Sequence, residues 1–340
     1  MRRDWNERAA SDPEYYIYTR DSQNLLDFEQ SGRANFDQLV LPFLPVLLNG
    51  RPAARCRVVE IGCGVGRMTR PFAEHFQHVY AFDISETMVE GARKRLRDCP
   101  NVTLHVGSGC DLDPMADVSV DLVFSYIVFQ HIPSHAVIEN YVREAARVLR
   151  PGGAFKFQVN GAGGEGAPDT WVGASFTSAD VDEMLRNAGL HRVAAEGNGS
   201  QYFVVTAMKG AGVLEDIHYI LPGEAAAADQ LLEGWGAARD GSWRPINPVC
   251  RVRLAPQAAT RFFAGIYFWP EDSGQVFEVR VVLGSQQILL KSVIANGDCY
   301  LESNVGIEPA ETDDTVTLTI NPSPRRAPAA RVLGFYASRE

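Results

Sequence analysis

The sequence lacks a long hydrophobic run and any apolar leader at its start. Its longest dense apolar segment, about residues 39–48, contains two prolines and is too short to cross a bilayer. The chain begins Met1-Arg2-Arg3 and continues with polar residues, which predicts that no secretory signal is present. We therefore expect a cytoplasmic protein without a transmembrane segment.

An excess of positive charge and a paired-cysteine motif are also missing. The chain has 32 Lys and Arg against 42 Asp and Glu, which gives a net charge of −10, and neither half is basic. Because nucleic-acid binding draws on clustered Lys and Arg, we expect no nucleic-acid partner. The six cysteines are scattered with no C-x-x-C pair, which predicts reduced thiols and no metal site.

Strand-like and helix-like segments alternate between residues 51 and 210. The strand-like segments are residues 57–61, 78–84, 102–106, 121–128, 155–159, 192–195 and 201–208. Amphipathic segments with helix caps separate most of them, for example Glu86 to Leu96 after Ser85. This alternation predicts an α/β fold with a doubly wound parallel sheet covered on both faces.

The chain on either side of this region has a different pattern. Residues 1–50 predict an N-terminal helical cap. Residues 211–230 predict a connector. Residues 231–340 contain short strand-like runs separated by Pro, Gly, Asn and Asp turns, which is typical of an all-β sandwich.

The sharpest motif is Glu60-Ile61-Gly62-Cys63-Gly64-Val65-Gly66, in which a strand enters a glycine-rich turn before a helix. Glycine lets the backbone approach a ligand closely, and a helix N-terminus offers unpaired N–H groups. Asp83 ends the next strand, roughly 20 residues further on, where a carboxylate can bind ribose hydroxyls. The Gly-x-Gly-x-Gly spacing differs from the Gly-x-Gly-x-x-Gly of dinucleotide sites and disfavours a dehydrogenase.

With further motifs, the sequence resembles the class I S-adenosylmethionine-dependent methyltransferases over about residues 50–210. The further motifs are Asp83-Ile84-Ser85, Val120 to Ser125, Phe129-Gln130-His131-Ile132 and Leu149-Arg150-Pro151-Gly152-Gly153. The resemblance implies a Rossmann-like seven-stranded sheet of order 3-2-1-4-5-7-6. It also implies S-adenosylmethionine as the cofactor and S-adenosylhomocysteine as the product.

The same resemblance implies the cofactor-binding residues. Glu60 and the backbone at Gly62 and Gly64 would hold the methionine end, and Asp83 would bind the ribose. The full set is Tyr16, Glu60, Gly62, Cys63, Gly64, Gly66, Asp83, Ile84, Met88, Cys110, Asp111, Leu112, Ser125 and Tyr126. Ile84 and Met88 would flank the adenine, Asp111 would read its amino group, and Ser125 and Tyr126 would lie beside the sulfonium.

Fewer sequence motifs indicate the residues that bind the methyl acceptor. A hydroxyl acceptor must lose a proton, which favours a histidine, and His131 is the candidate base. Gln130 and Trp171 are candidate substrate contacts. His131 could equally cap or fill a gap near the following helix.

The residues beyond about 230 loosely resemble the β-sandwich appended to bacterial polysaccharide-biosynthesis enzymes. The resemblance implies O-methylation of a hydroxyl on a sugar, glycan or glycolipid precursor, with a glycan-assembly complex or a homo-oligomer as the expected assembly. Two alternatives stay open. The acceptor could be a small natural product or quinone-like molecule, or the chain could be a non-catalytic scaffold with a vestigial cofactor site.

Overall fold

The computed structural model describes residues 1–18, 25–48, 51–162, 168–210, 217–220, 231–237, 244–253, 261–267, 276–283, 286–294, 298–302, 315–321 and 330–338. The chain divides into two compact units, Met1–Val213 and Leu214–Glu340.

The first unit contains one seven-stranded sheet of order β3-β2-β1-β4-β5-β7-β6. Its strands are β1 (Arg57–Ile61), β2 (His78–Asp83), β3 (Val102–Val106), β4 (Val120–Ser125), β5 (Leu149–Val159), β6 (Leu190–Glu196) and β7 (Phe203–Lys209). Strands β1 to β5 pair in parallel, and β7 is antiparallel to both β5 and β6. The observed order confirms the fold that the resemblance implied.

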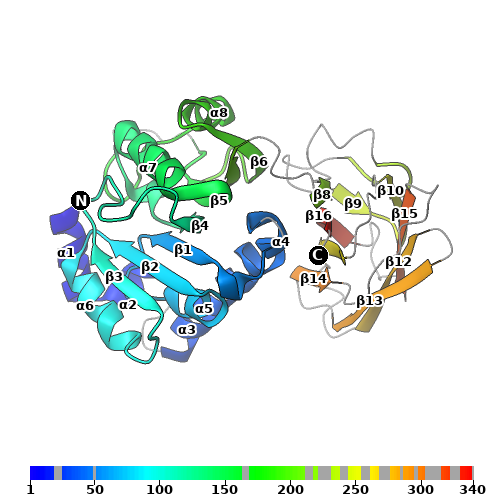
Figure 1. Cartoon of the computed structure of the whole chain (residues 1–340), viewed down its shortest axis with the longest axis horizontal. Coiled ribbons are helices and arrows are strands. Elements are labelled where there is room, and N and C mark those ends of the chain that lie inside the picture. The colour runs from blue at the N-terminus through cyan, green and yellow to red at the C-terminus, as the bar shows by residue number, and fades with distance from the viewer. Residues whose placement is uncertain are drawn as a thin grey trace. The chain divides into compact units, whose positions relative to one another are not determined.

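Helices lie on both faces of this sheet. They are α1 (Arg2–Ser11), α2 (Pro13–Ile17), α3 (Leu25–Leu39), α4 (Leu44–Leu47), α5 (Thr69–His75), α6 (Glu86–Arg95), α7 (His135–Val148) and α8 (Ser178–Asn187), with 3-10 turns η1 (Leu41–Phe43), η2 (Ala53–Arg55) and η3 (Phe129–His131). Figure 1 shows α7 and α8 on one side of the sheet and α3, α5 and α6 on the other. This two-sided cover explains why all six residues of β4 are buried.

Local sequence signals account for the helix ends. The Ser85 hydroxyl accepts a hydrogen bond from the N–H of Met88 and caps α6, which has Glu86 in its first turn and three basic residues in its last. Thr177 and Asp180 form a reciprocal capping box at the start of α8. These polar ends leave the apolar faces of both helices to pack on the sheet.

Aromatic side chains dominate the core on each face. Phe129, Phe155 and Phe157 are buried with the apolar side of α7. On the opposite face, Phe72 packs edge-on against Phe36 with ring centroids 5.1 Å apart. The carboxyl ends of the parallel strands are thereby held at one edge of a rigid sheet.

The second unit is rich in strands. These are β8 (Ile217–Ile220), β9 (Arg244–Ile246), β10 (Val249–Arg253), β11 (Arg261–Tyr267), β12 (Val276–Leu283), β13 (Gln286–Ile294), β14 (Asp298–Glu302), β15 (Thr315–Asn321) and β16 (Ala330–Ser338). They form one sheet of order β10-β15-β12-β13 and another of order β14-β11-β16-β8, with β9 paired to β16. On β12 and β15 alternate residues are buried, so one face of the first sheet is apolar.

The strand-rich character of this unit was expected from the turn spacing, and its description as a sandwich stays a prediction. Strand β8 falls within residues 211–230, the segment expected to be a connector, and pairs with β16. The remainder of that segment lies outside the described residues. The domain boundaries drawn from the sequence stay predictions.

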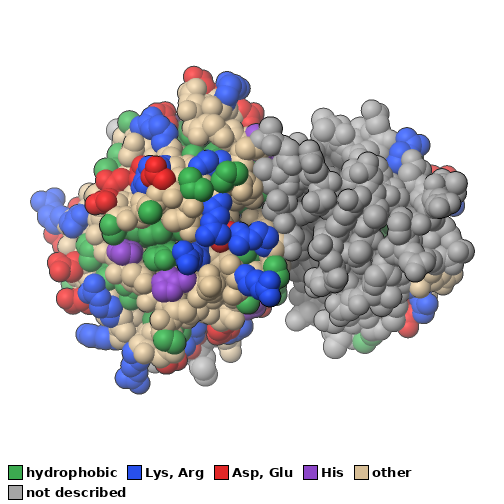
Figure 2. Space-filling model, in the orientation of Figure 1, with side chains coloured by type: hydrophobic (Ala, Val, Ile, Leu, Met, Phe, Trp, Pro, Cys, Tyr) green, Lys and Arg blue, Asp and Glu red, His purple; other side chains and the backbone are tan. Residues whose placement is uncertain are grey.

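Two surface properties bear on function. Within the described residues, no helix is long and apolar enough to cross a membrane. Figure 2 shows acidic and basic side chains spread together over the visible face of the first unit.

Candidate functional site

The turn that follows β1 brings backbone N–H groups to the carboxyl edge of the sheet. Gly62 and Cys63 both donate to the carbonyl oxygen of Phe82, at 2.7 and 2.9 Å. Gly62 and Gly64 have φ of +78° and +53°, values that side chains disfavour. A Cβ on Gly64 would lie 2.6 Å from Cδ1 of Ile17. Glycine therefore allows the N-terminal helices to approach this turn.

Asp83, at the end of β2, is fixed beside the turn. Its Oδ2 accepts a hydrogen bond from the N–H of Gly64 at 2.9 Å, and its Oδ1 accepts one from Ser85 at 2.8 Å. Burial raises the pKa of Asp83 to about 6 despite these bonds. A carboxyl group in this environment favours a ligand that donates hydrogen bonds to it.

Glu60 is a second acid at the same edge and is 4% exposed. Its Oε2 accepts a hydrogen bond from the hydroxyl of Thr69 at 2.6 Å. Burial raises the pKa of Glu60 to about 7. A positive charge placed beside Glu60 would stabilise its ionised form.

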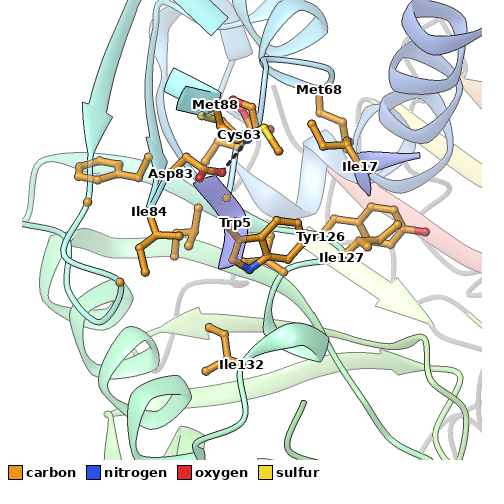
Figure 3. A pocket seen from close by; sticks show the side chains of 18 of the residues that line it. Trp5, Ile17, Cys63, Met68, Asp83, Ile84, Met88, Tyr126, Ile127 and Ile132 are labelled. Atoms are coloured by element: carbon orange, nitrogen blue, oxygen red, sulfur yellow. Dashed lines mark hydrogen bonds between the residues drawn. The ribbon is translucent and has the colours of Figure 1, made fainter. Parts of the chain in front are cut away.

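A pocket opens between these acids and the N-terminal helices. Figure 3 shows Asp83 and Ile84 toward one end and Tyr126 and Ile127 toward the other, with the Trp5 indole between them. All five line the pocket. Its wall therefore combines a few charged groups with mostly apolar side chains, as small-molecule sites usually do.

The helices α1 and α2, here called the cap, form part of this wall through Met1, Trp5, Tyr16 and Ile17. Polar contacts attach the cap to the rest of the unit. Arg2 donates to the carbonyl of Gly107 at 2.8 Å, and the Ser85 hydroxyl bonds Asn6 Oδ1 at 2.6 Å. Glu14 pairs with Arg95 on α6, and Arg8 donates to the Thr170 carbonyl at 3.0 Å.

His131 lies beside the pocket on η3. Its Nδ1 is 3.0 Å from the carbonyl oxygen of Trp171, so this nitrogen carries the proton. Its Nε2 is 3.2 Å from the side-chain amide of Gln130, which in turn bonds Gln158. Burial lowers the pKa of His131. Both ring nitrogens are thus engaged, and a role as general base requires Gln130 to release Nε2.

Residues 108–112, which were expected near the adenine, are held in place by hydrogen bonds within the protein. The backbone N–H groups of Cys110 and Asp111 both donate to the Ser108 hydroxyl. Asn140 donates to the carbonyl of Cys110, and the Leu112 N–H donates to Glu144. In this part of the chain, Gly107 and Gly109 line the pocket.

The pocket brings together nine of the residues predicted from the sequence. They are Tyr16, Glu60, Gly62, Cys63, Gly64, Asp83, Ile84, Met88 and Tyr126. The predicted residues that are not part of its wall are Gly66, Cys110, Asp111, Leu112, Ser125, Gln130, His131 and Trp171.

Sequence reasoning did not assign a site role to several wall residues. Trp5 and Ile17 reach the pocket only because the cap folds over it. Arg67 also lines the pocket. The sequence signal that could have identified Arg67 as a wall residue is its position directly after Gly66. No cluster of three or more potential metal ligands occurs among the described residues.

Comparison with known proteins agrees with this geometry. Residues 59–157 match the family described as a methyltransferase domain. The chain is 29% identical over 199 residues to a probable S-adenosylmethionine-dependent methyltransferase of Mycolicibacterium smegmatis, which covers 56% of this chain and 75% of that protein. It is 33% identical over 224 residues to a malonyl-[acyl-carrier protein] O-methyltransferase of Enterobacter lignolyticus, covering 66% of this chain and 78% of that protein.

Among solved structures, the magnesium protoporphyrin IX methyltransferase of Synechocystis PCC 6803 with bound S-adenosylhomocysteine matches with a TM-score of 0.47 at 19% identity. The match covers 61% of this chain and 98% of that chain.

The pocket of this chain fits S-adenosylmethionine. Asp83 presents a carboxylate to a donor pair such as a ribose diol, and Glu60 presents one to a cation. Gly62 and Gly64 leave the approach to the turn free of side chains. Together with this fit, the matches in sequence show that the chain belongs to the S-adenosylmethionine-dependent methyltransferases.

Proposed function

We propose that this protein transfers a methyl group from S-adenosylmethionine to a hydroxyl oxygen of a sugar-type acceptor, as part of a glycan or glycolipid precursor. The observation that carries the proposal is the group of aromatic side chains that the cap brings to the pocket. Tyr16 meets Trp171 edge-on with ring centroids 6.4 Å apart, and Trp5 lines the pocket. Aromatic faces suit the C–H surfaces of a sugar ring.

The residue roles follow from the pocket wall. Asp83 binds the ribose hydroxyls, and Glu60 with the Gly62–Gly64 backbone binds the methionine end. Ile84 and Met88, which line the same pocket, flank the adenine. Each assignment uses a residue that lines the pocket.

The chemistry is an in-line displacement at carbon. S-adenosylmethionine supplies a methyl group bonded to a positively charged sulfur. The chain holds the acceptor oxygen in line and excludes water, which can supply most of the rate enhancement. In this proposal Tyr126 and the aromatic side chains of the cap, which line the pocket, surround the aligned atoms.

His131 is the proposed proton acceptor when the acceptor is a hydroxyl. It is uncharged at neutral pH, since burial lowers its pKa. Gln130 holds Nε2 at 3.2 Å and would have to turn away as the acceptor enters. Gln130 and Trp171 are then the proposed acceptor contacts.

A second candidate is a small acceptor with a carboxylate or quinone-like group. It is favoured by the acceptor that the name of the Enterobacter lignolyticus relative states, a malonyl group on a carrier protein. A carboxylate acceptor would need no base, so His131 would then only position Trp171.

The test is transfer of an isotope-labelled methyl group to fractionated extract of the source cell. The fractions are polysaccharide, lipid-linked precursors and small molecules, with Asp83→Ala as the blank. Label in glycan or lipid-linked material supports the sugar proposal. Label only in small molecules refutes it in favour of the second candidate. Absence of cofactor binding by the wild-type protein would favour the non-catalytic scaffold.

We further propose that the strand-rich second unit is a sandwich that presents the acceptor or a glycan-assembly partner. The proposed location is the cytoplasm. Deleting that unit should then lower transfer to the natural acceptor while leaving cofactor affinity unchanged.

A further inference from the structure

The guanidinium group of Arg67 is buried in the pocket wall. Arg67 is 7% exposed and lies between the glycine turn and α5. One of its nitrogens, Nη1, donates to Ser31 Oγ at 3.2 Å and to Asn35 Oδ1 at 2.7 Å. Both acceptors are on α3, so this helix fixes the orientation of the group.

The other two nitrogens of Arg67 have no acceptor in the part of the chain that the structure describes. Nε is buried without a hydrogen-bond partner, and Nη2 makes no hydrogen bond to a described residue. Their N–H bonds point the same way along one edge of the planar group. This edge is the one that binds a carboxylate through two parallel hydrogen bonds.

A buried donor without an acceptor is costly, and a buried charge is more so. Burial accordingly lowers the pKa of Arg67. Within the described residues no ion pair neutralises this guanidinium. A bound anion would remove both costs at once.

Glu60 indicates which anion fits. It lines the same pocket, and its charge acts on that of Arg67. Arg67 and Glu60 are therefore a cation and an anion of the same pocket that form no ion pair with each other. A ligand group with an ammonium and a carboxylate on neighbouring atoms is complementary to this arrangement, and an α-amino acid is such a group.

We propose that the free edge of Arg67 binds the carboxylate of the cofactor's methionine end, while Glu60 binds its ammonium group. This proposal rests on the cofactor site assigned above and extends it to a residue without a role there. A carboxylate of the acceptor is the other possible source of the same chemistry, and the experiment separates the two.

The experiment is calorimetric titration of the full chain with three probes. S-adenosylhomocysteine carries the whole amino acid, decarboxylated S-adenosylmethionine keeps only the amine, and 5′-methylthioadenosine carries neither group. Arg67→Met removes the guanidinium group. Arg67→Lys keeps the positive charge but lacks the two parallel N–H donors. Arg70→Met is the matched control, because Arg70 lies on α5 and its guanidinium bonds Asp98 and the Arg95 carbonyl.

We expect Arg67→Met to weaken S-adenosylhomocysteine binding about 10- to 100-fold, in line with a charge-assisted pair of hydrogen bonds. Affinity for the other two probes should change less than about twofold, which also shows that the variant is folded. Arg67→Lys should recover part of the loss, and Arg70→Met should bind all three probes like the wild type.

Two results would overturn the proposal. Unchanged S-adenosylhomocysteine affinity in Arg67→Met would exclude the cofactor carboxylate and leave only an acceptor carboxylate for Arg67. An equal loss for all three probes would mean that Arg67 merely supports the fold. If the wild-type protein bound none of the probes, the cofactor site itself would be wrong, which is a different failure.

Discussion

Lys156 is a charged side chain in the core of the first unit, and replacing it with methionine should stabilise this unit at neutral pH. Lys156 is on β5 and is 1% exposed. Burial lowers its pKa from 10.5 to about 8. At about 1.4 kcal/mol for each pKa unit, the protonated side chain costs the fold about 3 kcal/mol at pH 7.

A cation–π contact offsets part of this cost. Lys156 Nζ is 3.6 Å from the centroid of the Phe43 ring, and such a contact contributes about 2 kcal/mol when it is desolvated. The net gain expected for Lys156→Met is therefore about 1–3 kcal/mol. For a unit of this size it corresponds to a rise in Tm of about 2–10 °C.

The stability difference between Lys156→Met and the wild type should depend on pH. Because the folded pKa is below the unfolded one, the unfolded chain binds more protons between pH 8 and 10.5, and the wild type gains stability across this interval. The advantage of Lys156→Met should thus be full below pH 8 and shrink as pH rises toward 10.5.

The assay is differential scanning calorimetry at pH 7 and pH 9.5. The transition of the first unit is identified as the one that S-adenosylhomocysteine raises. A Lys156→Met variant that is less stable than the wild type at both pH values would refute the reasoning, because it would show that the ammonium group is a net stabilising element.

Three further predictions concern the site and the sheet. Because the pKa values of Asp83 and Glu60 are about 6 and 7, S-adenosylhomocysteine affinity should fall at least about tenfold from pH 8 to 5.5; a flat calorimetric profile would contradict this. Gly64→Ala should lower stability by about 1–2 kcal/mol and weaken the same ligand, since its Cβ would meet Ile17 at 2.6 Å; a thermal shift with and without ligand measures both. Asp121→Asn removes the carboxylate charge that Arg51 and Arg150 contact at a 3% exposed position. It should lower the free energy of unfolding by about 2 kcal/mol, the value of hydrogen bonds to a charged group; denaturant unfolding checks it, and an unchanged midpoint would count against it.

The sheet was predictable because its signals are local. The runs at β1, β2 and β4 are apolar and β-branched, and each ends in a glycine or polar residue that stops the strand. The acids at the ends of β1 and β2 followed from the motif spacing. Parallel strands then bring Glu60 and Asp83 to one edge without further information.

The cap could not be placed in the same way. Half of the residues of helix α1 are charged, and its one described buried residue is Ala9. Its place over the pocket depends on contacts with residues far away in sequence, such as Arg8 with Thr170. The fifth strand also differs from expectation. The strand was expected at residues 155–159, but β5 begins at Leu149 and includes Pro151-Gly152-Gly153. It pairs with β4 through a register shift.

The hydrogen bonds of the His131 ring are a third feature that the sequence does not predict. A histidine after the fourth strand is recognisable as a candidate base. Its tautomer depends on the Trp171 carbonyl, 40 residues further along the chain. No pattern near His131 indicates that contact.

Because Trp5, Tyr16 and Ile17 belong both to the cap and to the pocket wall, ligand occupancy and local opening of the first 17 residues are thermodynamically linked. A ligand that binds only when the cap is closed raises the free energy of opening by RT ln(1 + L/Kd), where L is the free ligand concentration, which is about 2.7 kcal/mol at a hundredfold excess over Kd. Amide exchange and protease cleavage in α1 and α2 therefore report occupancy directly. They allow acceptor candidates to be ranked without observing methyl transfer.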